Sequence, residues 1–228
     1  YAGYTYHEYV YDYEKLTGAV IKVASDFPGF DSIGAFPVME GMLFMAAFLK
    51  DHPYLSPALR FVTGPYHDLL GERYGRFPGR ELSVNKPIQF IGGVFMEEDE
   101  YDALIKDPPT FLAETVIPRV CRNLENPGSA RAMGCLVKLG LEAARFMGAV
   151  MGLTQRLREL GYPSLPMAFS YSPLDLISDF LRGITNTVLD IHRRPDKVKE
   201  ACEALTPLMI QAGLVSTPPS PAQIYGIG

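Results

Sequence analysis

The sequence predicts an α/β protein that is heavily helical. Three observations support this prediction: long segments with apolar residues at helical spacing, one short continuous apolar run of strand type, and the recurrence of strand followed by helix. Hydrophobic residues make up 47% of the 228 residues, which is enough for a sizeable core. We therefore expect one domain that covers residues 1–228.

The N-terminal elements follow from the spacing of apolar residues and from the breakers between them. Apolar positions recur at helical spacing after Asp12, which predicts a helix over Asp12–Asp26. Asp31–Phe36 is typical of a short buried strand that Pro37 ends. Glu40–Lys50 is apolar nearly all round, so we expect a helix buried between other elements.

Residues 51–95 are interrupted by proline and glycine, and we interpret them as an irregular insertion with a helical turn around His67–Tyr74 and one extended segment. The acidic first turn of "MEEDEYDALIKDPP" predicts a short helix after this insertion. Phe111–Leu124 predicts a further helix, which Pro118 should kink or interrupt.

The C-terminal part contains the longest helical pattern and the clearest strand. Ser129–Leu160 predicts a packed helix or two helices in sequence, and Leu165–Phe169 predicts a strand. Helices are expected over Pro173–Arg182 and Pro195–Ala212. Residues 214–228 are rich in proline and glycine, so we expect a tail there.

Charge and composition exclude several classes of function. The net charge is −5 and the basic residues are scattered, which argues against a nucleic-acid partner. The most apolar stretch is too short to span a membrane. Cysteines and histidines show neither disulfide nor metal-ligand spacing, so we expect no metal site in this segment. Scattered thiols without a secretory signal predict a cytoplasmic location.

The stretch "FSYSPLDLISDFLRG" contains the candidate site residues. Ser170 and Tyr171 directly follow a predicted strand, where α/β folds place their ligands, although such hydroxyls also form ordinary turns. Ser172 and Asp175 have the spacing of a capping box, which gives Asp175 a structural role. Asp179 lies one turn further along the helix, either on a solvated polar face or at a functional site.

Two longer motifs resemble the uroporphyrinogen decarboxylase superfamily. "PMAFSYSPLDLISDFLRG" resembles that family's apolar strand, its Phe-x-x-x-Pro turn and its helix that finishes in glycine. "LDIHRRPDKVKEACEAL" resembles the helix start that follows, and "FDSIGAF" is similar to an early barrel strand of the family. The resemblance covers most of Asp12–Gly213 in order.

The resemblance implies a (β/α)8 TIM barrel with its site at the carboxyl ends of the strands. Family members are longer than this chain, and the sequence shows too few strands to close a barrel. The chain also begins at Tyr1 without an initiator methionine. We therefore expect a partial barrel, the N-terminal portion of a longer protein, whose C-terminal half lies beyond Gly228.

The family contains two chemistries, tetrapyrrole decarboxylation and cobalamin-dependent methyl transfer. This chain lacks the arginine-rich segment of the decarboxylases, and Asp179 occupies the position of their helical tyrosine. The methyltransferase branch uses zinc held by a His-x-Cys and a later Cys in the C-terminal half. No His-x-Cys occurs here, so the resemblance implies zinc only in that half, with no cofactor in this segment.

We therefore expect a corrinoid (cobalamin)-dependent methyltransferase paralogue. The alternatives are uroporphyrinogen III decarboxylase of tetrapyrrole biosynthesis and a non-catalytic fragment that binds a tetrapyrrole or a partner. Activity is expected from the full-length protein and not from the isolated fragment. The expected partners are a corrinoid protein that carries the corrinoid, or a tetrapyrrole substrate, and a second copy or the C-terminal half of the chain. The candidate catalytic residue is Asp179, and the candidate substrate-binding residues are Phe36, Phe169, Ser170 and Tyr171.

Overall fold

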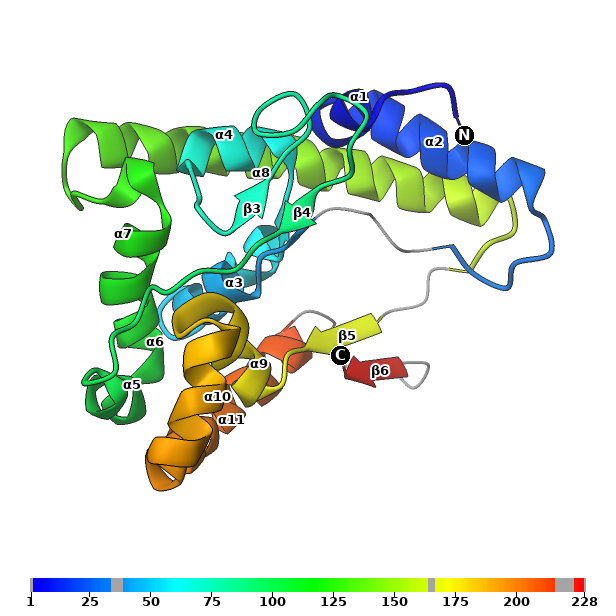
Figure 1. Ribbon diagram of the computed structural model, residues 1–228. Helices are drawn as coiled ribbons and strands as arrows, with labels where there is room; N and C mark the ends of the chain where they lie inside the picture. Colours follow the sequence, from blue (N-terminus) through cyan, green and yellow to red (C-terminus); the bar gives the residue numbers. More distant parts are fainter. Residues whose placement is uncertain (1, 34–38, 164–166, 216–223, 228) are drawn as a thin grey trace.

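The computed structural model describes residues 2–33, 39–163, 167–215 and 224–227. The described chain is mixed α/β and heavily helical, which confirms the coarse fold class expected from the sequence (Figure 1). Its described strands form three separate two-stranded sheets. Helices therefore provide most of the packing surfaces.

Two capped helices begin the chain. In α1 (Tyr6–Tyr11), Thr5 and Glu8 form a complete capping box, which satisfies backbone N–H groups at the helix start. In α2 (Tyr13–Asp26), the Asp12 carboxylate accepts hydrogen bonds from the second and third backbone N–H groups of the helix. The predicted helix over Asp12–Asp26 is therefore confirmed. The sequence analysis did not identify α1, which is short and depends on its cap.

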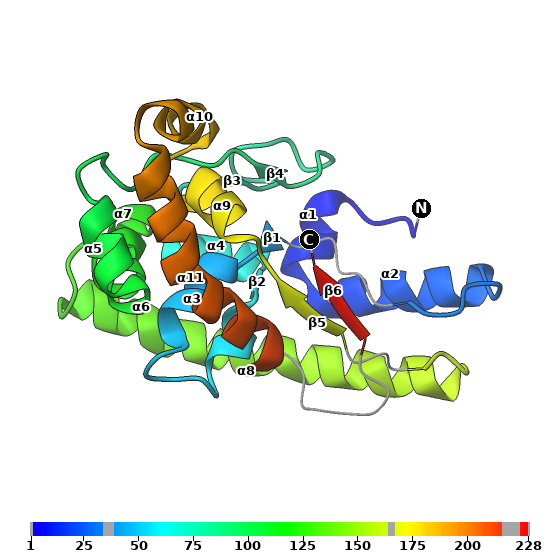
Figure 2. The same ribbon diagram turned by 90° about the horizontal axis from the view of Figure 1, so that it is seen from below.

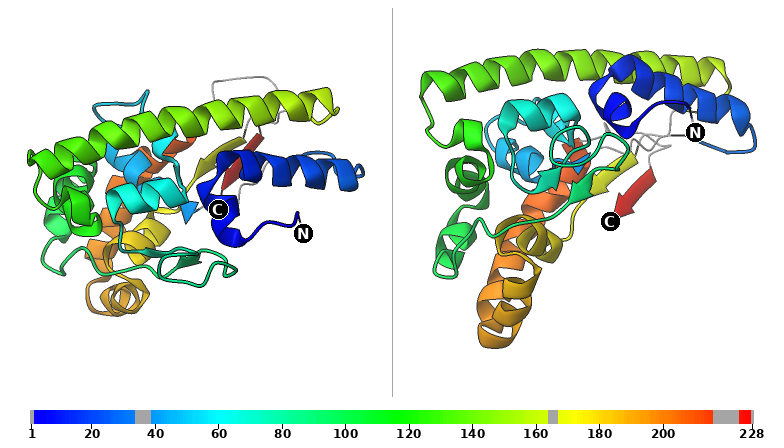
Figure 3. Two further views of the ribbon diagram at one scale, coloured as in Figure 1. Left: turned by 90° about the horizontal axis from the view of Figure 1, so that it is seen from above. Right: turned by 45° about the horizontal axis from the view of Figure 1, so that its top comes forward.

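The long helix α8 (Ala130–Glu159) runs along one side of the molecule with Ser129 as its N-cap. It is one continuous helix, as the sequence pattern allowed. Helix α2 lies beside it (Figure 3), and the two share a small apolar cluster away from the main core. Tyr162 follows α8 and donates its hydroxyl to the carbonyl of Ala24 at 2.7 Å, which ties the end of α8 to the end of α2.

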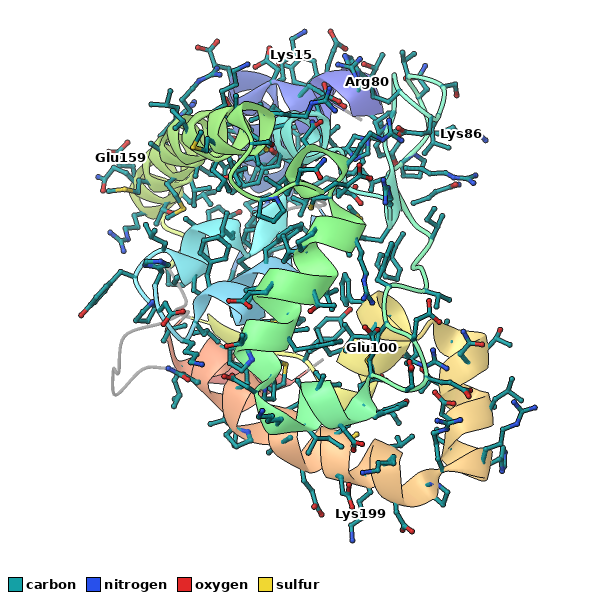
Figure 4. The ribbon with its side chains drawn as sticks, turned by 90° about the vertical axis from the view of Figure 1, so that its left-hand side faces the viewer. Lys15, Arg80, Lys86, Glu100, Glu159 and Lys199 are labelled. Atoms are coloured by element: carbon teal, nitrogen blue, oxygen red, sulfur yellow. The ribbon has the colours of Figure 1, made fainter. Side chains whose placement is uncertain are left out.

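The main core surrounds α3 (Met42–Phe48), whose residues from Met42 to Ala47 are all buried. This confirms the prediction of a helix enclosed by other elements. The helices that pack around α3 or support its neighbours are α4 (Gly64–Leu70), α5 (Tyr101–Lys106), α6 (Pro108–Phe111) and α7 (Ile117–Val120). Lys15, Arg80, Glu159 and Lys199 lie at the periphery (Figure 4).

A π-helical turn, η2 (Leu112–Val116), joins α6 to α7. The sequence predicted that Pro118 would kink or interrupt a helix at this place. Proline has no N–H group to donate to the carbonyl four residues earlier, and a wider turn just before it accommodates that loss. The chain thus continues as a helix through the proline, in three short pieces.

Residues 51–95 contain short elements as well as loops. They are η1 (Ser56–Leu59), β2 (Phe61–Val62), α4, β3 (Gly75–Arg76) and β4 (Gln89–Phe90). Strand β2 pairs antiparallel with β1 (Met39–Glu40), and β3 pairs antiparallel with β4. Val62, Tyr66 and Tyr74 from this segment belong to the same core as α3.

The C-terminal part contains the one parallel strand pair in the described chain. Strand β5 (Met167–Ser170) pairs with β6 (Ile224–Ile227) (Figure 2). The elements between them are α9 (Pro173–Leu176), the π-helical turn η4 (Ile177–Leu181), α10 (Ile184–Arg193) and α11 (Pro195–Val215). Helix α11 packs against β5, so this unit is a strand–helix–strand crossover.

The observed strands differ from the strands that the sequence predicts. Strand β6 lies inside residues 214–228, which were expected to be a tail. Residues Asp31–Ile33 form no strand, and the remainder of the predicted strand Asp31–Phe36 lies outside the described residues. The predicted strand Leu165–Phe169 is observed as β5 from Met167 to Ser170, and the first two residues of the predicted strand lie outside the described residues.

A buried ion pair connects the C-terminal helices to the loop before α5. Arg182 Nε donates to the carboxylate of Asp190 at 2.8 Å, and Arg182 Nη1 donates to the carbonyl of Met96 at 2.8 Å. The hydroxyl of Tyr101 donates to the same Asp190 oxygen at 3.0 Å. Both charged side chains are buried, so the charge of each is compensated by the other while the Met96 carbonyl and the Tyr101 hydroxyl add hydrogen bonds.

Replacing Asp190 by alanine should lower the free energy of unfolding by about 3–5 kcal/mol, because a buried guanidinium would lose its counter-ion. Tyr101→Phe should cost less, about 1.5–3 kcal/mol, since it removes one hydrogen bond to a charged group. Urea unfolding measures both values. Lys197→Ala is the control, because this exposed lysine forms surface ion pairs, which contribute little to stability. Equal losses for Asp190→Ala and Lys197→Ala would contradict this account.

Candidate functional site

The candidate site lies where β5 ends and the chain turns toward α9. Ser170 is the last residue of β5, and its hydroxyl donates to the carbonyl of Met209 in α11 at 2.6 Å. Ser170 therefore ties the strand to the helix that covers it. The ring of Phe169 is half-buried and lies below the guanidinium of Arg60, whose Cζ is 5.1 Å from the ring centre.

Tyr171 and Asp179 form a hydrogen-bonded pair. The Tyr171 hydroxyl donates to Asp179 Oδ2 at 3.3 Å, and the Ser178 hydroxyl donates to Oδ1 at 3.2 Å. The turn that brings Asp179 to Tyr171 is η4, and π-helical turns occur frequently at functional sites. The pair thus joins the strand end to the following helix.

Burial shifts both groups toward their neutral forms. Burial raises the pKa of Asp179 above its ordinary value, and the nearby carboxylate of Asp175 adds to this rise. The hydrogen bonds from Ser178 and Tyr171 lower the same pKa by a smaller amount. Burial and the Asp179 carboxylate raise the pKa of Tyr171 to about 12. A carboxyl group that holds its proton more tightly than usual can serve as a hydrogen-bond donor or general acid.

A second acid, Glu40, reaches the same region from β1. Its Oε2 atom lies 3.9 Å from Arg60 Nε, and both atoms are shielded from solvent without a hydrogen-bond partner among the described residues. Burial raises the pKa of Glu40, while Arg60 acts in the opposite direction. The sequence analysis missed this acid, because only the pairing of β1 with β2 brings Glu40 and Arg60 together.

Glu40 and Tyr171 line a cavity of ≈ 420 Å³, which we name the aromatic cavity. This volume lies within the range of about 300–1,000 Å³ that is usual for small-molecule sites. Aromatic rings make up much of its wall. The residues that line it are Tyr6, Val10, Met39, Glu40, Pro87, Ile88, Phe90, Tyr171 and Phe180.

Asp179 lines a neighbouring hollow of ≈ 360 Å³, which shares Phe90 with the aromatic cavity. This hollow lies between residues 90–94 and the segment 178–186. The bond between Tyr171 and Asp179 therefore crosses from one hollow to the other. A ligand in the aromatic cavity would meet the Tyr171 hydroxyl, with the Asp179 carboxyl behind it.

Some of the predicted site residues lie at or beside the aromatic cavity and others do not. Phe36 lies outside the described residues. Tyr171 lines the aromatic cavity, Asp179 lies one hydrogen bond away, and Phe169 packs edge-on against Tyr171 with ring centres 6.0 Å apart. The Ser170 hydroxyl is directed to the α11 backbone.

The cap of α9 is simpler than expected. Ser172 Oγ accepts a hydrogen bond from the backbone N–H of Asp175 at 3.3 Å. The return bond from the Asp175 carboxylate to the Ser172 backbone is absent among the described hydrogen bonds, and Asp175 is exposed. The capping role therefore belongs to Ser172, whose oxygen satisfies a free N–H of the first turn.

His67, at the start of the predicted helical turn His67–Tyr74, lies in a different part of the molecule. The ring is buried, stacks on Phe77 with centres 4.2 Å apart, and lies 2.6 Å from Glu72 Oε1. Glu72 accepts further hydrogen bonds from the backbone N–H groups of Tyr74 and Gly75. This network fixes the turn after α4, and His67 takes no part in the aromatic cavity.

Metal-ligating clusters and membrane-spanning helices are both absent from the part of the chain that the structure describes. No group of three His, Cys, Asp or Glu side chains among the described residues could hold a metal ion. Over the same residues, no helix has the length and apolar character needed to cross a bilayer.

Comparisons with protein-family models, with curated proteins and with solved structures found no match.

The raised pKa of Asp179 predicts a change in the pH dependence of stability. Folding favours the protonated carboxyl, so its stabilising contribution is fully present below pH 3.8 and is lost as pH rises through the raised pKa. Asp179→Asn removes this titration. The stability of wild type relative to the variant should therefore fall as pH rises from 3.8 toward neutral, in urea unfolding at a series of pH values. Parallel stability profiles would contradict the shift.

Proposed function

We propose that this chain forms part of a (β/α)8 barrel of the uroporphyrinogen decarboxylase type. The parallel pair β5–β6 supports this proposal, because parallel strands joined by a helical crossover are the unit from which such barrels are built. The position of Tyr171 supports it too. This residue directly follows β5 and lines a cavity, as active-site residues do at the carboxyl ends of barrel strands.

Within that family, we propose corrinoid-dependent methyl transfer. The observation that supports methyl transfer is the lining of the aromatic cavity. In this lining, Glu40 is the charged residue among apolar and aromatic residues. A porphyrinogen with many carboxylates needs basic partners such as arginine, and an acid-lined cavity repels it. An uncharged or cationic substrate, by contrast, suits this lining.

The residues of this chain would bind the substrate and manage a proton beside it. While Asp179 is ionised, Tyr171 donates to it, and the phenol oxygen is free to accept a hydrogen bond from a ligand. When Asp179 holds a proton, Tyr171 can donate toward the cavity instead. Zinc does not fit the described residues, which contain no suitable donor group, so we assign no step to it.

The corrinoid would be presented by a partner protein at the open side of the cavity. Tyr6 and Phe90 are both exposed at this side, which leaves room for a second macromolecule to approach. We propose that this encounter takes place in the cytoplasm. The three free cysteines are consistent with a reducing compartment.

Methyl transfer can be measured with free methylcobalamin and the full-length protein that contains residues 1–228, by following the absorbance of the corrinoid. We expect turnover that falls by about 100-fold in Asp179→Asn, the size of a lost general acid. Asp175→Asn is the matched control, since this carboxylate is exposed and outside both hollows, and turnover should fall far less than in Asp179→Asn. Decarboxylation of a porphyrinogen without methyl transfer would instead establish the decarboxylase alternative.

An apolar stripe along α8 supports a role in binding a partner chain as well. Val137, Leu141 and Met151 are 66%, 66% and 69% exposed. Gly140, Ala144 and Gly148 are exposed at intervals of four residues between them, which permits close approach of another helix. Large exposed apolar surfaces of this kind mark interaction sites. We propose that a second copy of the chain covers this stripe.

Charging the stripe should dissociate that oligomer. Leu141→Lys places an ammonium group in the apolar contact, so we expect the protein to sediment as a monomer at concentrations where wild type is a dimer. Lys138→Ala, on the exposed flank of the same helix, is the control and should leave the dimer intact. A monomeric wild type would contradict self-association.

A further inference from the structure

The walls of the aromatic cavity are arranged around a single acid. Phe180 forms its floor and is only 1% exposed, whereas Tyr6 and Phe90 are 46% and 43% exposed at its mouth. The ring centres of Phe90 and Tyr171 lie 5.3 Å and 5.9 Å from that of Phe180. These pairs are inclined at 63° and 61°, so Phe90 and Tyr171 both pack edge-on against Phe180 in the wall of the cavity.

Aromatic faces carry partial negative charge and attract cations within about 6 Å of the ring centre. A ligand that fills a cavity of ≈ 420 Å³ between these rings would contact several of them together. Quaternary ammonium groups suit such sites particularly well, because their charge is spread over methyl groups that also gain from apolar contact.

Glu40 supplies the counter-charge. Its Oε2 atom has no hydrogen-bond partner among the described residues, and its distance of 3.9 Å from Arg60 exceeds the roughly 2.7–2.9 Å of a charge-assisted hydrogen bond. The Arg60 guanidinium is held by the rings of Phe61 and Phe169, at 5.0 Å and 5.1 Å from their centres. The Glu40 side chain is 31% exposed and lines the cavity, so its carboxyl group can act as the counter-charge of a cation there.

The wall of the aromatic cavity offers few hydrogen-bond acceptors, and this indicates which kind of cation it can bind. A primary ammonium group needs three hydrogen-bond acceptors, and a guanidinium needs up to five. Glu40 and the Tyr171 hydroxyl are the polar side-chain groups of the cavity wall, apart from the Tyr6 hydroxyl at its mouth. A fully methylated ammonium has no N–H group to satisfy and needs only the nearby charge and the rings.

We propose that the aromatic cavity binds a quaternary ammonium group, with Glu40 as its counter-ion and Phe90, Tyr171 and Phe180 as its walls. The role of this ligand as the methylated substrate rests on the proposed methyltransferase function. The binding itself does not depend on that function, because it follows from the cavity alone.

The test uses choline and its neutral isostere 3,3-dimethyl-1-butanol, which replaces the charged nitrogen by carbon. Isothermal titration of the purified full-length protein should show binding of choline and at least about tenfold weaker binding of the alcohol, a difference of roughly 1.4 kcal/mol. Tetramethylammonium should compete with choline. Equal affinity for choline and the alcohol would overturn the proposal in favour of a merely apolar cavity, and so would the absence of choline binding.

Two variants separate the acid from the rings. Glu40→Gln should weaken choline binding by about tenfold and leave the alcohol unaffected, since it removes only the charge. Phe90→Leu should weaken choline binding by about two- to fivefold, the value of one exposed cation–π contact. Phe90 is exposed, so this variant remains informative if Glu40→Gln fails to fold. Tyr54→Leu, at a 95% exposed position that does not line the cavity, is the control.

Unchanged choline affinity in Phe90→Leu would overturn the placement of the ligand in this cavity. The outcome for the methyltransferase proposal is separate. Choline binding with the expected variant pattern, but without methyl transfer to or from a corrinoid, would refute the proposed function and leave the ammonium site intact. Methyl transfer without choline binding would do the reverse.

Discussion

The buried pair between Arg182 and Asp190 is the interaction on which the site depends. It fixes the end of η4 against α10, while Arg182 also donates to the carbonyl of Met96. The backbone N–H groups of Phe95 and Met96 donate in turn to the carbonyl of Leu181, at 2.7 Å and 3.0 Å. The loop that follows β4, the strand that contains Phe90, is thereby held against η4, which contains Phe180. Desolvated charges tolerate little change in geometry. The Arg182–Asp190 pair therefore fixes the positions of Phe90 and Phe180, two walls of the aromatic cavity.

Much of the helical structure was predictable because it is encoded locally. The apolar spacing and caps that predict α2, α8 and α11 lie within each segment, and the structure confirms those helices. The strand pairings were not predictable in the same way. Strand β1 is two residues long and exists through its partner β2, which lies about twenty residues further along the chain. The barrel itself stays a proposal, since the described sheets contain two strands each.

The same division between local and distant contacts applies to the candidate site. Tyr171 and Asp179 lie eight residues apart across one strand–helix turn, so their proximity follows from a helical pattern that the sequence shows. Glu40 and Phe90 reach the cavity from β1 and β4. No local pattern connects these residues to Tyr171, because folding brings them together only through the packing of elements distant in sequence. The sequence therefore indicates Tyr171 and Asp179, and not Glu40, the acid that lines the aromatic cavity.

The two acids of the site are separated by Tyr171. Its ring lines the aromatic cavity with Glu40 and its hydroxyl bonds to Asp179, so each carboxylate raises the pKa of the phenol. With that pKa at about 12, the phenol keeps its proton at neutral pH. It therefore remains able to donate a hydrogen bond, and an ionised Asp179 draws that donation to its own side. A cation bound beside Glu40 would favour the ionised form of both acids. That change would turn the Tyr171 proton toward Asp179 and present the phenol oxygen to the ligand. Binding of a cation in the cavity would thus determine the direction in which the Tyr171 hydroxyl donates.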